Sequence, residues 1–158
     1  MGATTWRRPA ARTHRSFPTR SSPRAPRSNA PLRVLALDYG SARCGVAVSD
    51  PTGTLATPLE PVLRPASKKG WAALKARIAA SGAERVVVGL PVSLSGSDSA
   101  QTVEVREFAA RLGRAQSVPV ELYDERFTTS LAHQAGGNAS LDSRAAAVLL
   151  EEWLRTQP

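Results

Sequence analysis

The sequence contains a single cysteine, Cys44, which excludes a framework of disulfide bonds. This sparing use of cysteine fits a cytoplasmic setting, and Cys44 lies in an apolar pattern typical of a small buried residue. No apolar run approaches the roughly 20 residues that a transmembrane helix needs. A P-loop, a Rossmann glycine fingerprint and a CxxC metal motif are also missing. The three tryptophans are too scattered to form a platform for stacking bases.

Acidic side chains are absent from the first 33 residues, which hold eight arginines and carry the net charge of +8. The rest of the chain is balanced, with 13 basic and 13 acidic side chains. Residues 1–31 have no apolar period, so we expect a disordered basic extension before one domain at 32–158. Three origins remain open for the extension: an arm that binds phosphates, an organellar transit peptide, or a stretch upstream of the true start.

Hydrophobic periodicity from residue 33 onward predicts an α/β domain. Strands at 33–38, 44–49 and 54–62 form an antiparallel meander, with a turn at 50–53. The two prolines of the third strand favour a short strand or one at an edge of the sheet. Two further strands and four helices follow, and the first strand of this second part is apolar enough to be buried on both faces. The ranges are helix 69–81, strand 85–90, helix 100–113, strand 118–124, a short helix from Thr128 or Thr129, and helix 142–155.

Some local features of these elements are predicted in detail. Gly40 is available for a positive φ in the turn after the first strand. Ser99 is expected to cap the helix at 100–113, which would bury Val103, Phe108 and Leu112. The last helix is expected to bury Ala146, Leu149, Leu150 and Trp153.

Three acids from distant stretches are the candidate catalytic residues. Asp38 and Glu125 each end a predicted strand, and Asp142 lies where the last helix begins. Such positions can converge at one edge of a sheet, and convergent carboxylates bind the divalent ions that cleave phosphodiesters. The strand at 85–90 carries no acid and cannot supply a ligand.

Each of these acids also has an ordinary structural interpretation. Asp38 could cap a turn, although Gly40 and Gly45 would let the chain fold sharply and leave it facing a groove. Asp142 could be the N-cap of its helix, with Ser143 as the alternative. The Asp124–Arg126 run could be an exposed charged turn. On a strand, neighbours point to opposite faces, and we favour Glu125 over Asp124 as the ligand.

Four motifs in this order closely resemble the YqgF family, also called RuvX. They are RVLALDYGSARCGVAVSDPTGTLATPLEPV, VVVGLPVSLSGSDSAQTVEVREFAARL, VELYDERFTT and LDSRAAAVLL, and the resemblance spans about residues 33–155. It implies a ribonuclease H-like fold related to Holliday-junction resolvases, with a five-stranded mixed sheet of a meander and two parallel strands flanked by helices. It also implies a nuclease that trims pre-16S rRNA in ribosome biogenesis.

The resemblance also assigns residues. The acidic triad of the family falls on Asp38, Glu125 and Asp142, and its substrate loop falls on Gly89, Leu90, Pro91 and Gly96. We expect nucleic-acid contacts from Arg43, Ser93, Ser95, Gly96, Arg126 and Thr128, where the planar fork of Arg126 suits a phosphate. The chain departs from the family at about 130–140, where the segment is short and has no basic residue.

We therefore predict a metal-dependent phosphodiesterase that acts on structured RNA with Mg²⁺ or Mn²⁺ held by the triad. It would act as a monomer or weak dimer with nucleic acid as its partner. Three alternatives remain: a non-catalytic RNA-binding module of ribosome assembly, a Holliday-junction resolvase, and a phosphotransferase of the actin/hexokinase type. The phosphotransferase would need two such domains, and this chain has room for one.

Overall fold

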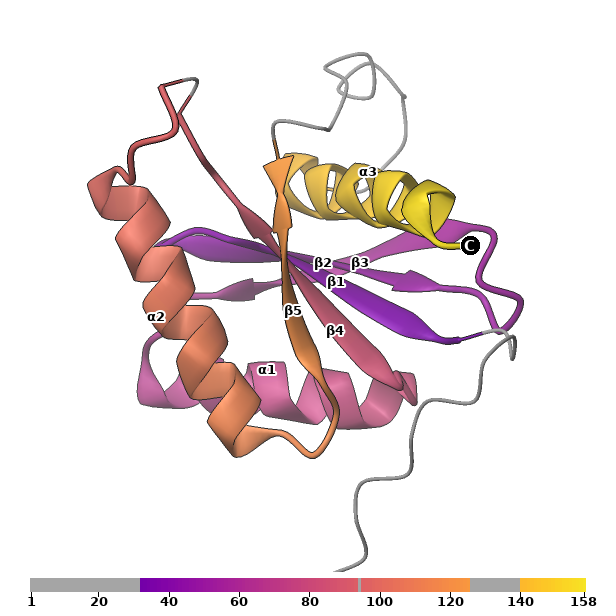
Figure 1. Cartoon of the computed structure of the whole chain (residues 1–158). Coiled ribbons are helices and arrows are strands. Elements are labelled where there is room, and N and C mark those ends of the chain that lie inside the picture. The colour runs from indigo at the N-terminus through magenta and orange to yellow at the C-terminus, as the bar shows by residue number, and fades with distance from the viewer. Residues whose placement is uncertain (1–31, 94, 126–139) are drawn as a thin grey trace, which may run out of the picture.

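The computed structural model describes residues 32–93, 95–125 and 140–158. These residues form one five-stranded sheet in the order β3-β2-β1-β4-β5, with helices on both faces (Figure 1). The elements are β1 (Val34–Tyr39), β2 (Arg43–Ser49), β3 (Ala56–Leu63), α1 (Lys68–Ser81), β4 (Arg85–Leu90), α2 (Ala100–Ala115), β5 (Val120–Asp124) and α3 (Leu141–Thr156).

The sheet is mixed, as the sequence predicts. β1, β2 and β3 pair as an antiparallel meander, whereas β4 runs parallel to β1 and β5 runs parallel to β4. The predicted five-stranded mixed sheet, an antiparallel meander followed by two parallel strands, is thereby confirmed. Because β1, β4 and β5 run in the same direction, their carboxyl ends meet at one edge of the sheet, and the end of β3 reaches that edge as well.

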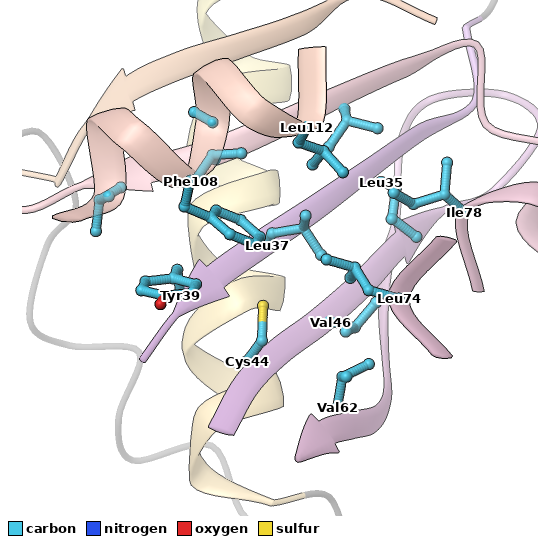
Figure 2. Packing of buried hydrophobic residues seen from close by; sticks show 14 of the residues in the cluster. Leu35, Leu37, Tyr39, Cys44, Val46, Val62, Leu74, Ile78, Phe108 and Leu112 are labelled. Atoms are coloured by element: carbon cyan, nitrogen blue, oxygen red, sulfur yellow. The ribbon is translucent and has the colours of Figure 1, made fainter. Parts of the chain in front are cut away.

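The core is divided between the two faces of the sheet. Alternate residues of β1 point to opposite sides, so Leu35, Leu37 and Tyr39 face α1 and α2. Figure 2 shows this cluster, in which Leu37 lies near Phe108 of α2 and Leu74 of α1 approaches Val46 of β2. Val34 and Ala36 point to the other face, which α3 covers. The α3 face is therefore the one on which Asp38 is expected.

Helix α3 is fixed to the sheet at both ends. The buried Ser143 Oγ accepts a hydrogen bond from the backbone N–H of Val46 at 3.4 Å. At the far end, Trp153 Nε1 donates to Glu121 Oε1 at 3.0 Å, and the other oxygen of Glu121 lies 2.6 Å from Arg85 Nη1. Along its length, Ala146, Leu149, Leu150 and Trp153 are buried, as predicted.

Several boundaries and caps are confirmed. The turn at 50–53 closes with a hydrogen bond from Gly53 N to the Asp50 carbonyl at 3.0 Å. Helix α1 ends before Gly82, which adopts a left-handed conformation. Ser99 caps α2 in a capping box with Thr102. β4 is buried on both faces, with Val86, Val87 and Val88 fully inaccessible.

β3 lies at an edge of the sheet, as predicted, and a register shift opposite Gly45 interrupts its pairing with β2. Three other details were predicted wrongly. Val103 is 45% exposed, since the buried side of α2 is formed by Thr102, Val105, Phe108, Ala109 and Leu112. Gly40 has no positive φ. A Cβ there would instead lie 2.7 Å from the Arg43 carbonyl oxygen, so Gly40 serves a close approach of the chain.

The third wrong detail concerns the cap of the last helix. Its N-cap is Ser140, whose side chain accepts from the Ser143 backbone N–H. Asp142 is already inside the first turn of the helix, where the positive end of the helix dipole stabilises its carboxylate. Ser143 bonds to β2 and is not the cap. In the described part of the chain, no helix is long and apolar enough to cross a membrane.

Candidate active site

Asp38 lies near the end of the central strand β1 and is flanked by glycine on both neighbouring strands. Its register partner on β2 is Gly45. On β4, Val88 pairs with Leu37, so Gly89 follows at the level of Asp38. Strand alternation places all three residues on the α3 face, beside the buried Ala36, Ala47 and Val87. The two glycines leave space on either side of the carboxylate.

Glu125 fills the space over Gly89. It follows β5 directly, and its Oε1 lies 2.5 Å from where a Cβ on Gly89 would stand. The Glu125 side chain is hydrogen-bonded to that of Asp38. Burial, the negative charges of Asp38 and Asp124, and this hydrogen bond raise the pKa of Glu125 to about 7. Near neutral pH Glu125 is therefore at the midpoint of its titration, and its protonated form can donate the hydrogen bond to Asp38.

Asp142 occupies the other side, over Gly45. A Cβ on Gly45 would overlap the Asp142 carbonyl oxygen and crowd the Ser143 backbone N at 3.0 Å. The Asp142 carboxylate is 39% exposed, and its Oδ2 lies 4.0 Å from Arg43 Nη1. Because Arg43 is 61% exposed, this ion pair is weak and leaves the Asp142 carboxylate available for other partners.

The pKa of the buried Cys44 thiol is affected by two of these acids. Its side chain is fully buried, and burial together with the negative charges of Asp38 and Asp142 raises the pKa of its thiol. The thiol stays protonated at neutral pH and is no nucleophile.

The donor chemistry fits a hard divalent cation. All three acids supply carboxylate oxygens, and the close Asp38 and Glu125 pair carries a repulsion that a cation would relieve. Among the described residues, however, no group of three or more His, Cys, Asp or Glu is gathered as a finished metal site. The structure brings Asp38 and Glu125 into contact and sets the backbone of Asp142 over Gly45, the register partner of Asp38, while the Asp142 carboxylate lies next to Arg43.

The predicted substrate loop follows β4 at the same edge of the sheet. Gly96 has a φ of 78° and its N–H donates to the Ser93 carbonyl at 2.9 Å, which makes a tight turn. Exposed hydroxyls of Ser93, Ser95 and Ser97 are linked to each other, with Ser93 and Ser95 oxygens 2.8 Å apart. These groups can donate to phosphate oxygens. Arg126 and Thr128 lie outside the described residues, as do the short helix and the short segment predicted after Glu125.

Sequence reasoning missed what Gly45 and Gly89 do. The sequence analysis predicts that Gly45 helps the chain to fold sharply. In the structure Gly45 lies within β2, and the absence of a side chain lets the backbone at the start of α3 pack against it. The strand at 85–90 was dismissed because it has no acid, yet its Gly89 makes room for Glu125. A glycine inside a strand often marks a close approach of another group, so a signal was present in the sequence.

Comparisons with known proteins cover nearly all of the folded region. The family model described as "RuvX: Holliday junction resolvase" matches residues 32–156. Three relatives bear the name "Putative pre-16S rRNA nuclease". The Gloeobacter violaceus relative is 38% identical, and the match covers 78% of this chain and 83% of the relative. The Nocardioides sp. relative is 44% identical, and the match covers 78% of this chain and 87% of the relative. The Koribacter versatilis relative is 47% identical over 61% of this chain, and the match spans 63% of its length.

Solved structures show a weaker likeness. The RuvC structure of Thermus thermophilus is 18% identical, covers 78% of this chain and 96% of its own, and has a TM-score of 0.49. At this level of similarity the comparison adds nothing to the assignment of residues or chemistry.

Proposed function

The chain belongs to the RuvX family, and from this premise we propose that it is a metal-dependent nuclease that hydrolyses phosphodiester bonds in structured RNA. Its proposed role is 5′-end processing of pre-16S rRNA during ribosome biogenesis in the cytoplasm. The relatives named for pre-16S rRNA support the choice of substrate. The observation that carries the chemistry is the Asp38–Glu125 carboxyl pair, with Asp142 next to it across Gly45.

Asp38 and Glu125 would hold Mg²⁺ or Mn²⁺, and Asp142 would join from the first turn of α3. A bound ion of this kind activates a water for attack and stabilises the leaving oxygen. The protein's own part would be to keep the Asp38 and Glu125 carboxyl groups close at the ends of β1 and β5. The contact of the α3 backbone with Gly45 would hold Asp142 within reach of them. Ionisation of Glu125, whose pKa is about 7, prepares the pair for the cation.

The nucleic-acid partner would lie along the carboxyl ends of the strands. Arg43 stands beside Asp142 and can hold a phosphate near the acids. The hydroxyls of Ser93 and Ser95, together with the turn at Gly96, would contact the substrate from the loop after β4. Arg126 and Thr128 are proposed contacts from the segment after Glu125. We propose a monomer or weak dimer as the active form, with residues 1–31 as an extension outside the nuclease domain at 32–158.

Two other functions have an observation in their favour. The family model carries the description of a Holliday junction resolvase, which favours branched DNA as a substrate. A non-catalytic RNA-binding module is favoured by the lack of a finished three-residue metal site among the described residues. The same assay separates both alternatives from the proposed nuclease.

The test is cleavage of precursor 16S rRNA and of a four-way DNA junction, run side by side with Mn²⁺ and with EDTA. The proposal expects Mn²⁺-dependent cleavage of the RNA that is abolished in Asp38→Asn, with an unchanged fold by circular dichroism. RNA binding without cleavage would establish the binding module, and cleavage of the junction alone would establish the resolvase. Removing residues 1–31 in this assay shows whether the basic extension adds salt-dependent affinity.

A further inference from the structure

The positive charge of the folded region is concentrated in one stretch of the chain. Between Glu60 and Glu84 there is no acidic residue. This stretch contributes five of the 13 basic side chains found from residue 34 onward and none of the 13 acidic ones. The five are Arg64, Lys68, Lys69, Lys75 and Arg77. They belong to the turn after β3 and to α1, which packs on the face of the sheet opposite α3 (Figure 1).

Three of these side chains line a pocket between the end of β3 and α1. The pocket has a volume of about 210 Å³ and is lined by the end of β3, the turn that follows it and α1, including Arg64, Lys69 and Arg77. No acid is among its lining residues, and none of its three cations forms an ion pair within the described part of the chain. Cations gathered without a counterion leave a positive potential that favours an anion.

The wall of the pocket is held rigidly at Arg64. This residue has a φ of 43°, a left-handed conformation that is uncommon outside glycine. Its carbonyl accepts from Ser67 N at 2.9 Å and from Ser67 Oγ at 2.7 Å. Gly70 packs so closely on the same carbonyl that a Cβ there would overlap it. Arg64 is therefore presented at a fixed point of the surface.

The pocket lies at the same edge of the sheet as the candidate active site. β1 and β3 both run antiparallel to β2, so Asp38 and Arg64 both lie at the edge where these two strands end. The Arg64 N–H donates to the Ala42 carbonyl at 2.9 Å, and Leu63 is the register partner of Arg43. Arg43 in turn stands 4.0 Å from the Asp142 carboxylate. Arg43 thus lies next to the Asp142 carboxylate and pairs with the strand end that leads into the pocket. The carboxylates lie on the α3 face of this edge, and the pocket lies on its α1 face.

We propose that this pocket binds a backbone phosphate of the RNA substrate, away from the bond that is cleaved, through Arg64, Lys69 and Arg77. This inference rests on the proposed function for its choice of nucleic acid as the ligand. The guanidinium groups supply paired donors for phosphate oxygens, and Lys69 supplies a compact charge. Contacts of this kind fix the register of the strand and carry no sequence preference. The site would position the RNA so that the scissile bond reaches Asp38 and Glu125.

The experiment measures RNA affinity of the full chain against salt concentration, with a structured rRNA fragment and EDTA to prevent cleavage. Arg77→Gln and Lys75→Gln form a matched pair, because each removes one charge from α1 but only Arg77 lines the pocket. We expect Arg77→Gln to weaken RNA binding about fivefold and Lys75→Gln to change it less than twofold. The triple variant Arg64→Gln, Lys69→Gln, Arg77→Gln loses the contact with one phosphate. It should therefore lower the slope of log affinity against log salt concentration by about 0.7.

Equal effects of Arg77→Gln and Lys75→Gln would overturn the pocket, since they would show only a general effect of charge. Wild-type affinity in the triple variant would overturn it as well. The melting temperature of each variant is measured alongside to detect a fold defect. Arg77→Lys keeps the positive charge, and we expect it to bind RNA with most of the wild-type affinity. Failure of wild-type protein to cleave RNA with Mn²⁺ would reject the nuclease, while the binding comparison would still judge the pocket.

Discussion

The carbonyl oxygen of Asp142 occupies the space where Gly45 would carry a Cβ. Helix α3 therefore begins directly on β2, one strand away from Asp38. The contact is between backbone atoms and cannot be relieved by turning a side chain. Together with the hydrogen bond from Val46 to Ser143, it sets the position of the third acid relative to the first.

Gly45→Ala is expected to lower both stability and nuclease activity. The added methyl group must push the start of α3 away, and overpacking of this kind costs about 1–3 kcal/mol. The measurement is the free energy of unfolding in urea together with the cleavage rate. Gly113→Ala is the control. Gly113 lies inside α2, and a Cβ added to it would meet nothing closer than Val120 at 3.9 Å. This variant should have unchanged stability or be more stable by up to about 1 kcal/mol. Equal stability and equal activity in the two variants would contradict the role given to Gly45.

Gly89→Ala is expected to reduce activity with a smaller loss of stability than Gly45→Ala. The new Cβ would meet side-chain atoms, Glu125 Oε1 at 2.5 Å and Leu149 Cδ2 at 3.0 Å, and Glu125 can swing away. Separation from Asp38 and better hydration should then bring the pKa of Glu125 down toward its ordinary value. Carboxyl NMR titration measures that pKa, and an unchanged value near 7 would show that Glu125 has not moved.

Glu125→Gln is expected to stabilise the metal-free protein at pH 8 and to have no such effect at pH 4. The pKa of Glu125 is about 7 in the folded chain and 4.5 ordinarily, so the unfolded state releases its proton first as pH rises. Wild-type stability therefore falls between about pH 4.5 and 7, and the glutamine variant escapes this loss. Melting temperatures with EDTA at both pH values provide the check. A stability difference that does not vary with pH would rule out the raised pKa.

Mn²⁺ is expected to raise the melting temperature of wild-type protein at pH 8. A ligand that binds only the folded state at 100 times its Kd adds about 2.7 kcal/mol. Asp38→Asn should lose most of this rise, since it removes one of the two carboxylates in contact. Asp98→Asn is the control, because Asp98 is engaged with Arg106 on α2 at 3.0 Å and should keep the full rise. Equal Mn²⁺ responses in the two variants would remove Asp38 from the metal site.

Local patterns were enough to predict most of the fold. The apolar runs of β1 and β4 indicate buried strands, and Trp71, Leu74 and Ile78 mark the buried side of α1. The errors occurred where a neighbour in space decides. Val103 looks like a core residue of α2, yet the capping box turns Thr102 inward in its place. Asp142 looks like a cap, yet Ser140 takes that position.

For the site, the acids themselves were predictable and their arrangement was not. Asp38, Glu125 and Asp142 stand out in the sequence because each is placed at the end of a strand or the start of a helix. Nothing local indicates that the Glu125 side chain is hydrogen-bonded to Asp38, or that Asp142 lies beside Arg43. These relations join residues separated by about a hundred positions and depend on the order of strands in the sheet.

The sequence by itself determined the described helices and strands, the antiparallel meander and the three candidate acids, because periodicity, turn residues and motifs act over short distances along the chain. The two parallel strands were predicted from the family resemblance. Only the tertiary structure decided that Gly89 makes room for Glu125 beside Asp38 and Gly45 for the start of α3, and that Arg64, Lys69 and Arg77 line one pocket at the same edge. Close packing of backbone on backbone depends on which strands are neighbours, and that choice is made by the whole fold.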